Sequence, residues 1–435
     1  MARRQFTDCE GNTRRDFLKL GTAGLMGLGL SDLLRIEAQS ASSRAKAKSV
    51  IMVWLAGGPS TIDMWDLKPN APKEYAGEFK PIETSAKGVQ ISQHLPMMAK
   101  VMDRCTIVRS LKHTIPSHGP GTVFMHTGHK PTPAMDYPSM GSLTSKLLST
   151  QRGVPAYVTF GQSRNGASTA GYLGPAYNPF EIEGRADRGQ LSVRGITLPA
   201  GFSLDDLGNR EKLLEAFDSR FQSLDTGGDI VAGLDEFQQQ AVDILRSNKV
   251  KNAFDLDKES DKLRDRYGKD SFGQGALVCR RLVEAGVRFM SIGTGGWDTH
   301  GNNFKSLKDS RLPPIDRTVS ALVEDLDEKG LLDSTIVYVV GEFARTPKVN
   351  KKAGRDHWAR SMAVLLAGGG FQRGLAYGTT DDKGTAPDKS PCLPADICAT
   401  MFDLLGVDPK HELLTPSGRP MALFRDGSIL RGLQA

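Results

Sequence analysis

The sequence predicts an α/β fold, in which a mostly parallel central sheet carries helices on both faces. Two observations support this prediction. Short apolar runs alternate with amphipathic helical segments, and no internal repeat or low-complexity linker separates them. One large domain with insertions, over residues 43–435, therefore fits the chain better than two smaller domains.

The candidate strands are short runs that are apolar on both faces, as buried parallel strands are. They cover residues 49–55, 105–110, 154–160, 287–293, 335–340 and 361–370. The candidate helices cover residues 274–286, 313–330 and 394–406. Apolar residues at helical spacing in a charged segment predict a helical insertion over about residues 204–270, packed on the sheet or covering the site.

The N-terminus has the pattern of a twin-arginine export signal. Arg14 and Arg15 precede Phe17-Leu18-Lys19 and a Gly-rich apolar run. We therefore expect residues 1–42 to be a signal, the twin-arginine translocation machinery to be a partner, and the protein to be periplasmic or otherwise exported. The run is shorter than the roughly 20 residues of a spanning helix, so membrane contact is transient or made through an uncleaved signal. The alternatives are an amphipathic first helix or a membrane anchor.

The charge of the chain argues against nucleic acid as a partner. The net charge is +6, and the first fifty residues hold nine Lys or Arg against five Asp or Glu. The remainder is nearly balanced and has no basic stripe with interleaved aromatics, so we expect no nucleic acid as a partner.

Cys105 and Cys279 lie in apolar runs and are expected to be buried thiols. Cys392 and Cys398 are close enough in sequence to pair in an oxidising compartment, and spacing leaves that open.

Two strand ends offer groups that bind metals. Asp298 and His300 follow the strand at 287–293, and residues two apart in extended backbone point the same way. Glu342 follows the strand at 335–340, and Asp356 and His357 lie on the loop behind it. Mixed carboxylate and imidazole donors suit a divalent metal such as Zn²⁺ or Mn²⁺. The alternative is that the first pair caps a turn and Glu342 pairs with a nearby arginine.

Seven motifs in order carry a family resemblance over nearly the whole chain from residue 49 to residue 430. They are GGPSTIDMWDLKP, MHTGHKP, GYLGPAYNPF, GGWDTHGNNF, GEFARTP, GRDHW and LAGGGFQRGLAYGTTD. Together they resemble the DUF1501 family of exported bacterial proteins, which in turn resembles the alkaline phosphatase and sulfatase superfamily. The resemblance implies an alkaline phosphatase-like sandwich. It also implies hydrolysis of phosphate or sulfate esters at one or two metals, through a nucleophile at a helix N-terminus.

The resemblance assigns roles to single residues. Asp298, His300 and His357 resemble the superfamily's metal ligands, and Glu342 stands in the place of a ligand Asp. Phe343 stands where a ligand His follows that Asp, and Gly57 and Gly58 stand where acidic ligands lie. The other expected ligands are near in sequence to these positions: Asp63 and, beside the nucleophile position, His113.

The nucleophile position departs from the superfamily. Counting back from Thr127 in MHTGHKP places His118 there, where the superfamily needs Ser, Thr or Cys. Three hypotheses remain open. His118 is a further metal ligand and activated water attacks; or Ser117 or Thr122 is the nucleophile in a shifted register; or the site is catalytically inactive.

The function predicted from these residues is that of an exported metal-dependent hydrolase acting on a phosphate or sulfate ester of unknown size. Arg345 and Arg355 are expected to hold the anion, because guanidinium matches its oxygens bidentately, or else to pair with nearby acids. The alternative function is that of an inactive metal-binding or ligand-binding protein on the same fold.

Overall fold

The computed structural model describes residues 45–161, 167–186, 190–193 and 247–435. The expected signal, with Arg14 and Arg15, and most of the expected helical insertion lie outside the described residues. Residues 46–435 make up one compact unit. Within the described residues, no helix has both the length and the apolar character needed to cross a bilayer.

A nine-stranded sheet forms the centre of this unit, with strand order β13-β4-β12-β9-β1-β8-β5-β6-β7. Strands β9, β1, β8, β5 and β6 are parallel neighbours, β12 runs antiparallel between β9 and β4, and β7 is an antiparallel edge. The bounds are β1 Ser49–Leu55, β4 Cys105–Leu111, β5 Tyr157–Phe160, β6 Phe180–Arg185, β7 Gln190–Val193, β8 Phe289–Thr294, β9 Thr335–Val340, β12 Met362–Ala367 and β13 Leu375–Tyr377. The expected mostly parallel α/β sheet is confirmed.

Alternate side chains of the central strands enter two separate cores. In β1, Ile51 and Val53 pack into one core, and Val50 and Met52 pack into the other. Both sets are buried because a strand directs successive side chains to opposite faces of the sheet. This is why the runs read from the sequence are apolar throughout and do not alternate.

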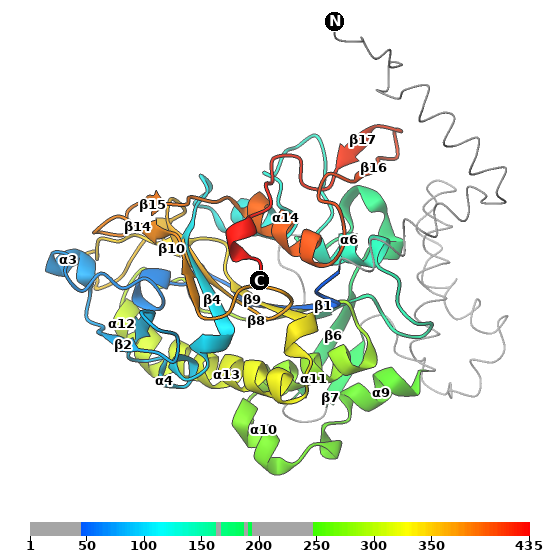
Figure 1. The fold of residues 1–435 in the computed structure, drawn as a ribbon, viewed down its shortest axis with the longest axis horizontal. Helices are drawn as coiled ribbons and strands as arrows, with labels where there is room; N and C mark the ends of the chain where they lie inside the picture. The colour runs from blue at the N-terminus through cyan, green and yellow to red at the C-terminus, as the bar shows by residue number, and fades with distance from the viewer. Residues whose placement is uncertain (1–44, 162–166, 187–189, 194–246) are drawn as a thin grey trace, which may run out of the picture. The chain divides into compact units, whose positions relative to one another are not determined.

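Helices cover both faces of the sheet (Figure 1). The helices α11 (Ser271–Ala285) and α13 (Leu312–Glu328) complete one core, together with the short α4 (Pro96–Ala99). On the opposite face lie α5 (His118–Thr127), α6 (Met140–Leu147) and α14 (Pro394–Leu404). At the described end of the expected insertion, α9 (Asn248–Phe254) and α10 (Asp261–Tyr267) pack beside α11 and α13.

Most predicted elements are present, and their bounds differ for local reasons. The strand predicted at 335–340 is β9, residue for residue. The run predicted at 361–370 ends earlier, at Ala367, because Gly368, Gly369 and Gly370 all have positive φ angles and cannot continue the strand.

The four described cysteines are free and buried. This confirms the expectation for Cys105 and Cys279, and it shows that Cys392 and Cys398 are not joined. Burial raises the pKa of Cys105 and of Cys392 to about 12, so both are inert thiols.

Candidate metal centre

The carboxyl ends of three adjacent parallel strands meet at one edge of the sheet. Gly57 follows β1, Asp298 follows β8, and Glu342 follows β9. Helix α5 begins at His118 beside them, after the segment that leaves β4. Open α/β sheets bind their ligands at this edge, outside the carboxyl ends of the strands.

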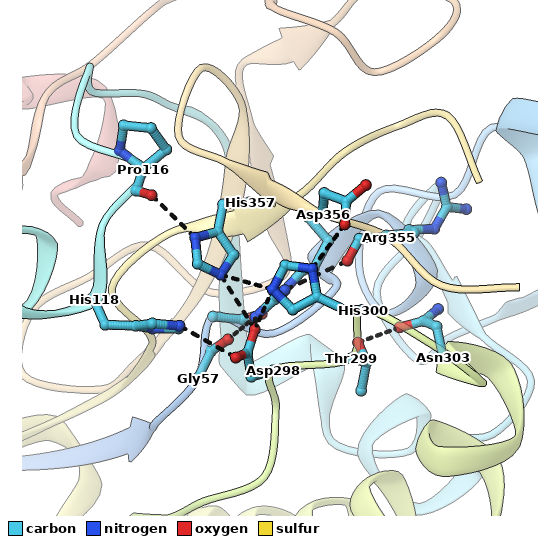
Figure 2. Close-up of polar contacts among 12 residues, drawn as sticks. Gly57, Pro116, His118, Asp298, Thr299, His300, Asn303, Arg355, Asp356 and His357 are labelled. Carbon is cyan, nitrogen blue, oxygen red and sulfur yellow. Dashed lines mark hydrogen bonds and ion pairs between the residues drawn. The ribbon is translucent and has the colours of Figure 1, made fainter. Parts of the chain in front are cut away.

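Three imidazole rings surround the carboxylate of Asp298 (Figure 2). The Nε2 atom of His300 lies 3.0 Å from Asp298 Oδ1, and that of His357 lies 3.2 Å from the same oxygen. On the other side, the Nε2 atom of His118 lies 3.4 Å from Asp298 Oδ2. Ligand atoms of His118, Asp298 and His357 all lie within 4.8 Å of one another.

The other ring nitrogen of each histidine faces an oxygen. The Nδ1 of His118 lies 2.6 Å from Glu342 Oε1, and that of His300 lies 2.7 Å from Asp356 Oδ1. The Nδ1 of His357 lies 3.0 Å from the carbonyl oxygen of Pro116. Because these oxygens accept hydrogen bonds, the Nδ1 of each ring can donate a proton to the oxygen behind it. Metal-binding histidines are commonly oriented in this way by an oxygen behind the ring.

With the protons on Nδ1, three Nε2 lone pairs face the same carboxylate. The Nε2 atoms of His300 and His357 are also only 3.0 Å apart. Lone pairs and carboxylate oxygens at such distances repel one another unless positive charge lies between them. A metal cation held by His118, Asp298 and His357 would supply that charge, so the donor set fits a divalent metal.

Glu342 ties the first of these histidines to the sheet. Its side chain is buried, with a residue exposure of 2%, and its Oε1 also accepts a hydrogen bond of 2.9 Å from the backbone N–H of Gly57. Its second oxygen, Oε2, is buried and has no hydrogen-bond partner among the described residues. An unpaired buried carboxylate oxygen beside the cluster adds a further negative charge that a cation would offset.

Arg345 holds Asp298 from behind. Its guanidinium donates to Asp298 Oδ1 and to the carbonyl oxygens of Gly57 and Gly58. Burial alone would raise the pKa of Asp298, but the hydrogen bond and charge of Arg345, with smaller contributions from His357 and His300, lower it to about 2. The carboxylate is therefore ionised at neutral pH and ready to bind a cation.

The structure uses the two expected anion-binding arginines differently. Both side chains are fully buried, and their donors bond to protein oxygens. Arg355 forms two hydrogen bonds to Asp63, of 2.9 and 2.8 Å, and donates its remaining protons to backbone carbonyls. Neither guanidinium is thus available to an incoming anion.

Asp63, which we expected to be a metal ligand, is the carboxylate partner of Arg355 in this ion pair. Its carboxylate also accepts hydrogen bonds from Ser60, at 2.6 Å, and from Asn303, at 2.8 Å. The structure therefore does not bring it to the histidines, because both of its oxygens are occupied by donors. His113, which we also expected to be a metal ligand, faces a backbone group instead. Its Nε2 lies 2.8 Å from the carbonyl oxygen of Glu342, and burial lowers its pKa to about 4.

Thr122 and Ser117, the two candidate nucleophiles, differ in whether the hydroxyl is already hydrogen-bonded within the protein. Thr122 donates its hydroxyl to the carbonyl oxygen of His118 at 2.7 Å, within helix α5. Ser117 is the N-cap of α5, is exposed, and makes no capping hydrogen bond with its side chain. It lies between Pro116 and His118, which both contact the histidine cluster. Of the two hydroxyls, only that of Ser117 is free to meet a ligand.

Sequence reasoning did not find Asn350. Its Nδ2 donates to the carbonyl oxygen of His300 at 3.0 Å and lies 3.3 Å from each carboxylate oxygen of Asp356. Its side chain therefore orients the Asp356–His300 pair. The signal that could have revealed it is the turn-forming sequence Asn350-Lys-Lys-Ala-Gly354, just before the Asp-His pair.

Comparison with known proteins identifies a family but no activity. A family model described as "Protein of unknown function (DUF1501)" matches residues 47–433. No curated protein sequence matches the chain. The solved PsFucS1 sulfatase from Pseudoalteromonas sp. aligns at 15% identity and a TM-score of 0.38, over 92% of this chain and 75% of that one.

An alkaline phosphatase from the Antarctic bacterium TAB5 aligns at 14% identity and a TM-score of 0.32, over 76% of this chain and 95% of that one. At these TM-scores the similarity carries no argument about the chemistry of the site.

Proposed function

This chain belongs to the DUF1501 family of proteins of unknown function, and from its site we propose that it is an exported, metal-dependent hydrolase of a phosphate or sulfate ester. One observation carries the proposal. Three histidines present Nε2 to Asp298, while an oxygen holds the opposite nitrogen of each ring. Such convergence is expected of a built cation site and not of a solvated charged surface.

The metal would be held by Asp298, His118 and His357, with His300 beside them. Three protein ligands that leave a position open are typical of catalytic zinc, and the mixed donors also suit Mn²⁺. When bound, the metal would polarise the ester oxygen and lower the pKa of a nucleophilic hydroxyl or water. Asp298 and His357 are only partly buried, so a substrate has access to the site.

The chain's own residues supply a nucleophile and an anion-binding element. Ser117 presents an exposed hydroxyl at the N-terminus of α5, a helix of 10 residues. The positive end of a helix dipole stabilises negative charge there, whether on a serine oxygen or on the ester. The choice of ester rests on the motifs shared with the superfamily, since the buried arginines do not bind the anion.

A second candidate function is that of a metal-binding or ligand-binding protein without turnover. The observation in its favour is that both candidate anion-binding guanidiniums are occupied by Asp298 and Asp63. The two functions share the metal and differ only in catalysis, so one set of measurements separates them.

The test starts with metal analysis of the full chain purified without chelators, followed by assays on an aryl phosphate and an aryl sulfate. We expect one class of ester to be hydrolysed, the activity to disappear on chelation, and Zn²⁺ or Mn²⁺ to restore it. His357→Ala should lose both metal and turnover, and Ser117→Ala should keep the metal and lose turnover.

The matched control is His411→Ala, which removes an exposed histidine of the C-terminal part of the chain. Bound metal without turnover of either ester would support the binding protein instead. Absence of metal from the purified protein, together with no turnover, would overturn the hydrolase and the metal-binding protein alike.

A further inference from the structure

A rigid turn carrying two lysines is attached to the metal centre. Residues 350–354, here called the lysine turn, include Lys351 and Lys352, which are both exposed. The side chain of Asn350 closes the turn, because its Oδ1 accepts hydrogen bonds from the backbone N–H groups of Lys352, at 2.9 Å, and of Gly354, at 3.0 Å. The same side chain bonds to His300 and Asp356, as described above.

Backbone contacts fix the position of the turn against the loop that carries His300. The carbonyl oxygen of Lys352 accepts a hydrogen bond of 3.0 Å from the N–H of Asn302, and that of Ala353 accepts one of 2.9 Å from Asn303. A Cβ atom placed on Gly354 would overlap the carbonyl oxygen of His300, so the two segments are in direct contact.

Two residues of this contact have positive φ angles. Ala353 and Asn302 both have a φ angle of 50°, in the left-handed region that glycine and asparagine adopt readily and alanine rarely does. Ala353 has no polar side chain to offset that conformation, and such strain persists only where the surrounding structure holds it. The lysine turn is therefore a fixed part of the rim of the site.

The lysines of this turn have no internal counter-charge. Neither Lys351 nor Lys352 forms an ion pair with a described residue, and Lys348, on the same loop, is also exposed and unpaired within that part of the chain. By contrast, Asp356, the nearest carboxylate in sequence, is engaged by His300 and Asn350. Two like charges on neighbouring residues of one turn repel each other, and an anion bound by both lysines would offset that repulsion.

We propose that the lysine turn binds a second anionic group of the substrate, which is thus an oligoanionic ester carrying several sulfate or phosphate groups. This inference rests on the proposed function, because it places the reacting ester at the metal centre and a neighbouring anionic group on Lys351 and Lys352. A small monoester would occupy only the metal centre and would leave the lysine turn empty. Lysine suits the second, because its ammonium group on a flexible stem accepts anions in several geometries.

Calorimetric titration of the full, zinc-loaded chain tests this assignment, with sucrose octasulfate as the oligoanion and glucose 6-sulfate as the singly charged probe. The variant Lys351→Gln/Lys352→Gln should bind sucrose octasulfate about tenfold more weakly, while its binding of glucose 6-sulfate is unchanged. Lys87→Gln/Lys410→Gln is the control, because it removes the same charge from two exposed lysines outside the turn.

Equal affinity of the variant and the wild type for sucrose octasulfate would overturn the inference. So would lysine-dependent binding to phosphatidylglycerol vesicles without any effect on the octasulfate, which would assign the turn to a membrane surface. Zinc content is measured separately on each protein. If the chain retains zinc and the lysines have no effect, only the role of the lysine turn is refuted. If it retains neither zinc nor manganese, the proposed metal site is refuted, and the effect of the lysines on octasulfate binding can still be compared.

Discussion

The Nδ1 atom of His118 lies 2.6 Å from Oε1 of Glu342, and this contact joins the first residue of α5 to the end of β9. Glu342 is buried and His118 is partly exposed, so the carboxylate is the fixed partner. The contact determines which imidazole nitrogen faces Asp298. It therefore links the sheet to the proposed metal through one hydrogen bond.

Glu342→Gln tests that link. Glutamine keeps the size of the side chain and an acceptor oxygen, but it removes the negative charge behind His118. We expect the dissociation constant of the metal to rise about 10- to 100-fold, as for other groups that orient metal ligands. Competition with a chromophoric chelator measures it. The control is Glu412→Gln at an exposed site in β16 (Glu412–Leu414), and an unchanged metal affinity in Glu342→Gln would refute the orienting role.

Gly57→Ala tests the close approach of β1 to the loop after β8. Gly57 has a φ angle of 120°, and an added Cβ would lie 2.6 Å from the backbone nitrogen of Asp298. We expect Asp298 to shift, metal affinity to fall, and the free energy of unfolding to drop by more than the roughly 1–2 kcal/mol that a positive φ alone costs a side chain. Chemical denaturation and the same chelator competition measure the two effects.

The control for this prediction is Gly88→Ala. Gly88 also has a positive φ angle, of 75°, but an added Cβ there meets nothing within 4 Å. Gly88→Ala should lower the free energy of unfolding only by the cost of the positive φ angle and should leave metal binding unchanged. If both variants behave alike, the contact between Gly57 and Asp298 does not position the site.

Asp63→Asn tests whether Asp63 is an internal counter-ion. Both members of the Asp63–Arg355 pair are buried, and removing one leaves the charge of the other buried and unpaired. We expect the free energy of unfolding to fall by about 3–5 kcal/mol. Metal affinity of the folded protein should stay unchanged, and a loss of affinity in Asp63→Asn would restore Asp63 as a ligand.

The matched control is Asp309→Asn, which breaks the exposed pair of Lys305 and Asp309, whose atoms are 2.6 Å apart. Solvent screens exposed pairs and they contribute little, so this variant should be close to the wild type in stability.

The fold was readable from the sequence because its strands are buried on both sides. Every position of the run 335–340 is β-branched or aromatic and buried, and Gly341 ends the run, so the strand pattern and the turn residue agree. The approach of Asp298 and Glu342 to one place was also foreseeable, since groups that follow parallel strands of one sheet reach the same edge.

The sequence did not predict which buried charged residues pair with each other. Asp63 and Arg355 are separated by 292 positions, and Arg345 reaches back to Gly58 across 287. Nothing local in the chain decides whether a carboxylate near a strand end meets a guanidinium or a metal. That choice depends on side-chain packing behind the sheet edge, which periodicity does not describe.

His126 should make the folded state sensitive to acid. It lies in α5 with its Nε2 buried and unpaired among the described residues, and its ring packs edge-on against Trp54 at a centroid distance of 4.5 Å. Burial lowers its pKa to about 4. An unfolded histidine has a pKa of about 6.5, so between these values the unfolded chain binds the extra proton. Stability is therefore complete above about pH 6.5, falls as the pH drops towards 4, and levels off below it.

Replacing this group removes its share of the pH dependence. We expect His126→Phe to lose less stability than the wild type between pH 7 and pH 4, by on the order of 3 kcal/mol. Urea unfolding at several pH values measures the difference, and His126→Leu repeats the test with a smaller side chain in case phenylalanine overpacks the core. His411→Gln, at an exposed site, should retain the pH dependence of the wild type. If the His126 variants retain it too, the buried imidazole is not the source of the acid sensitivity.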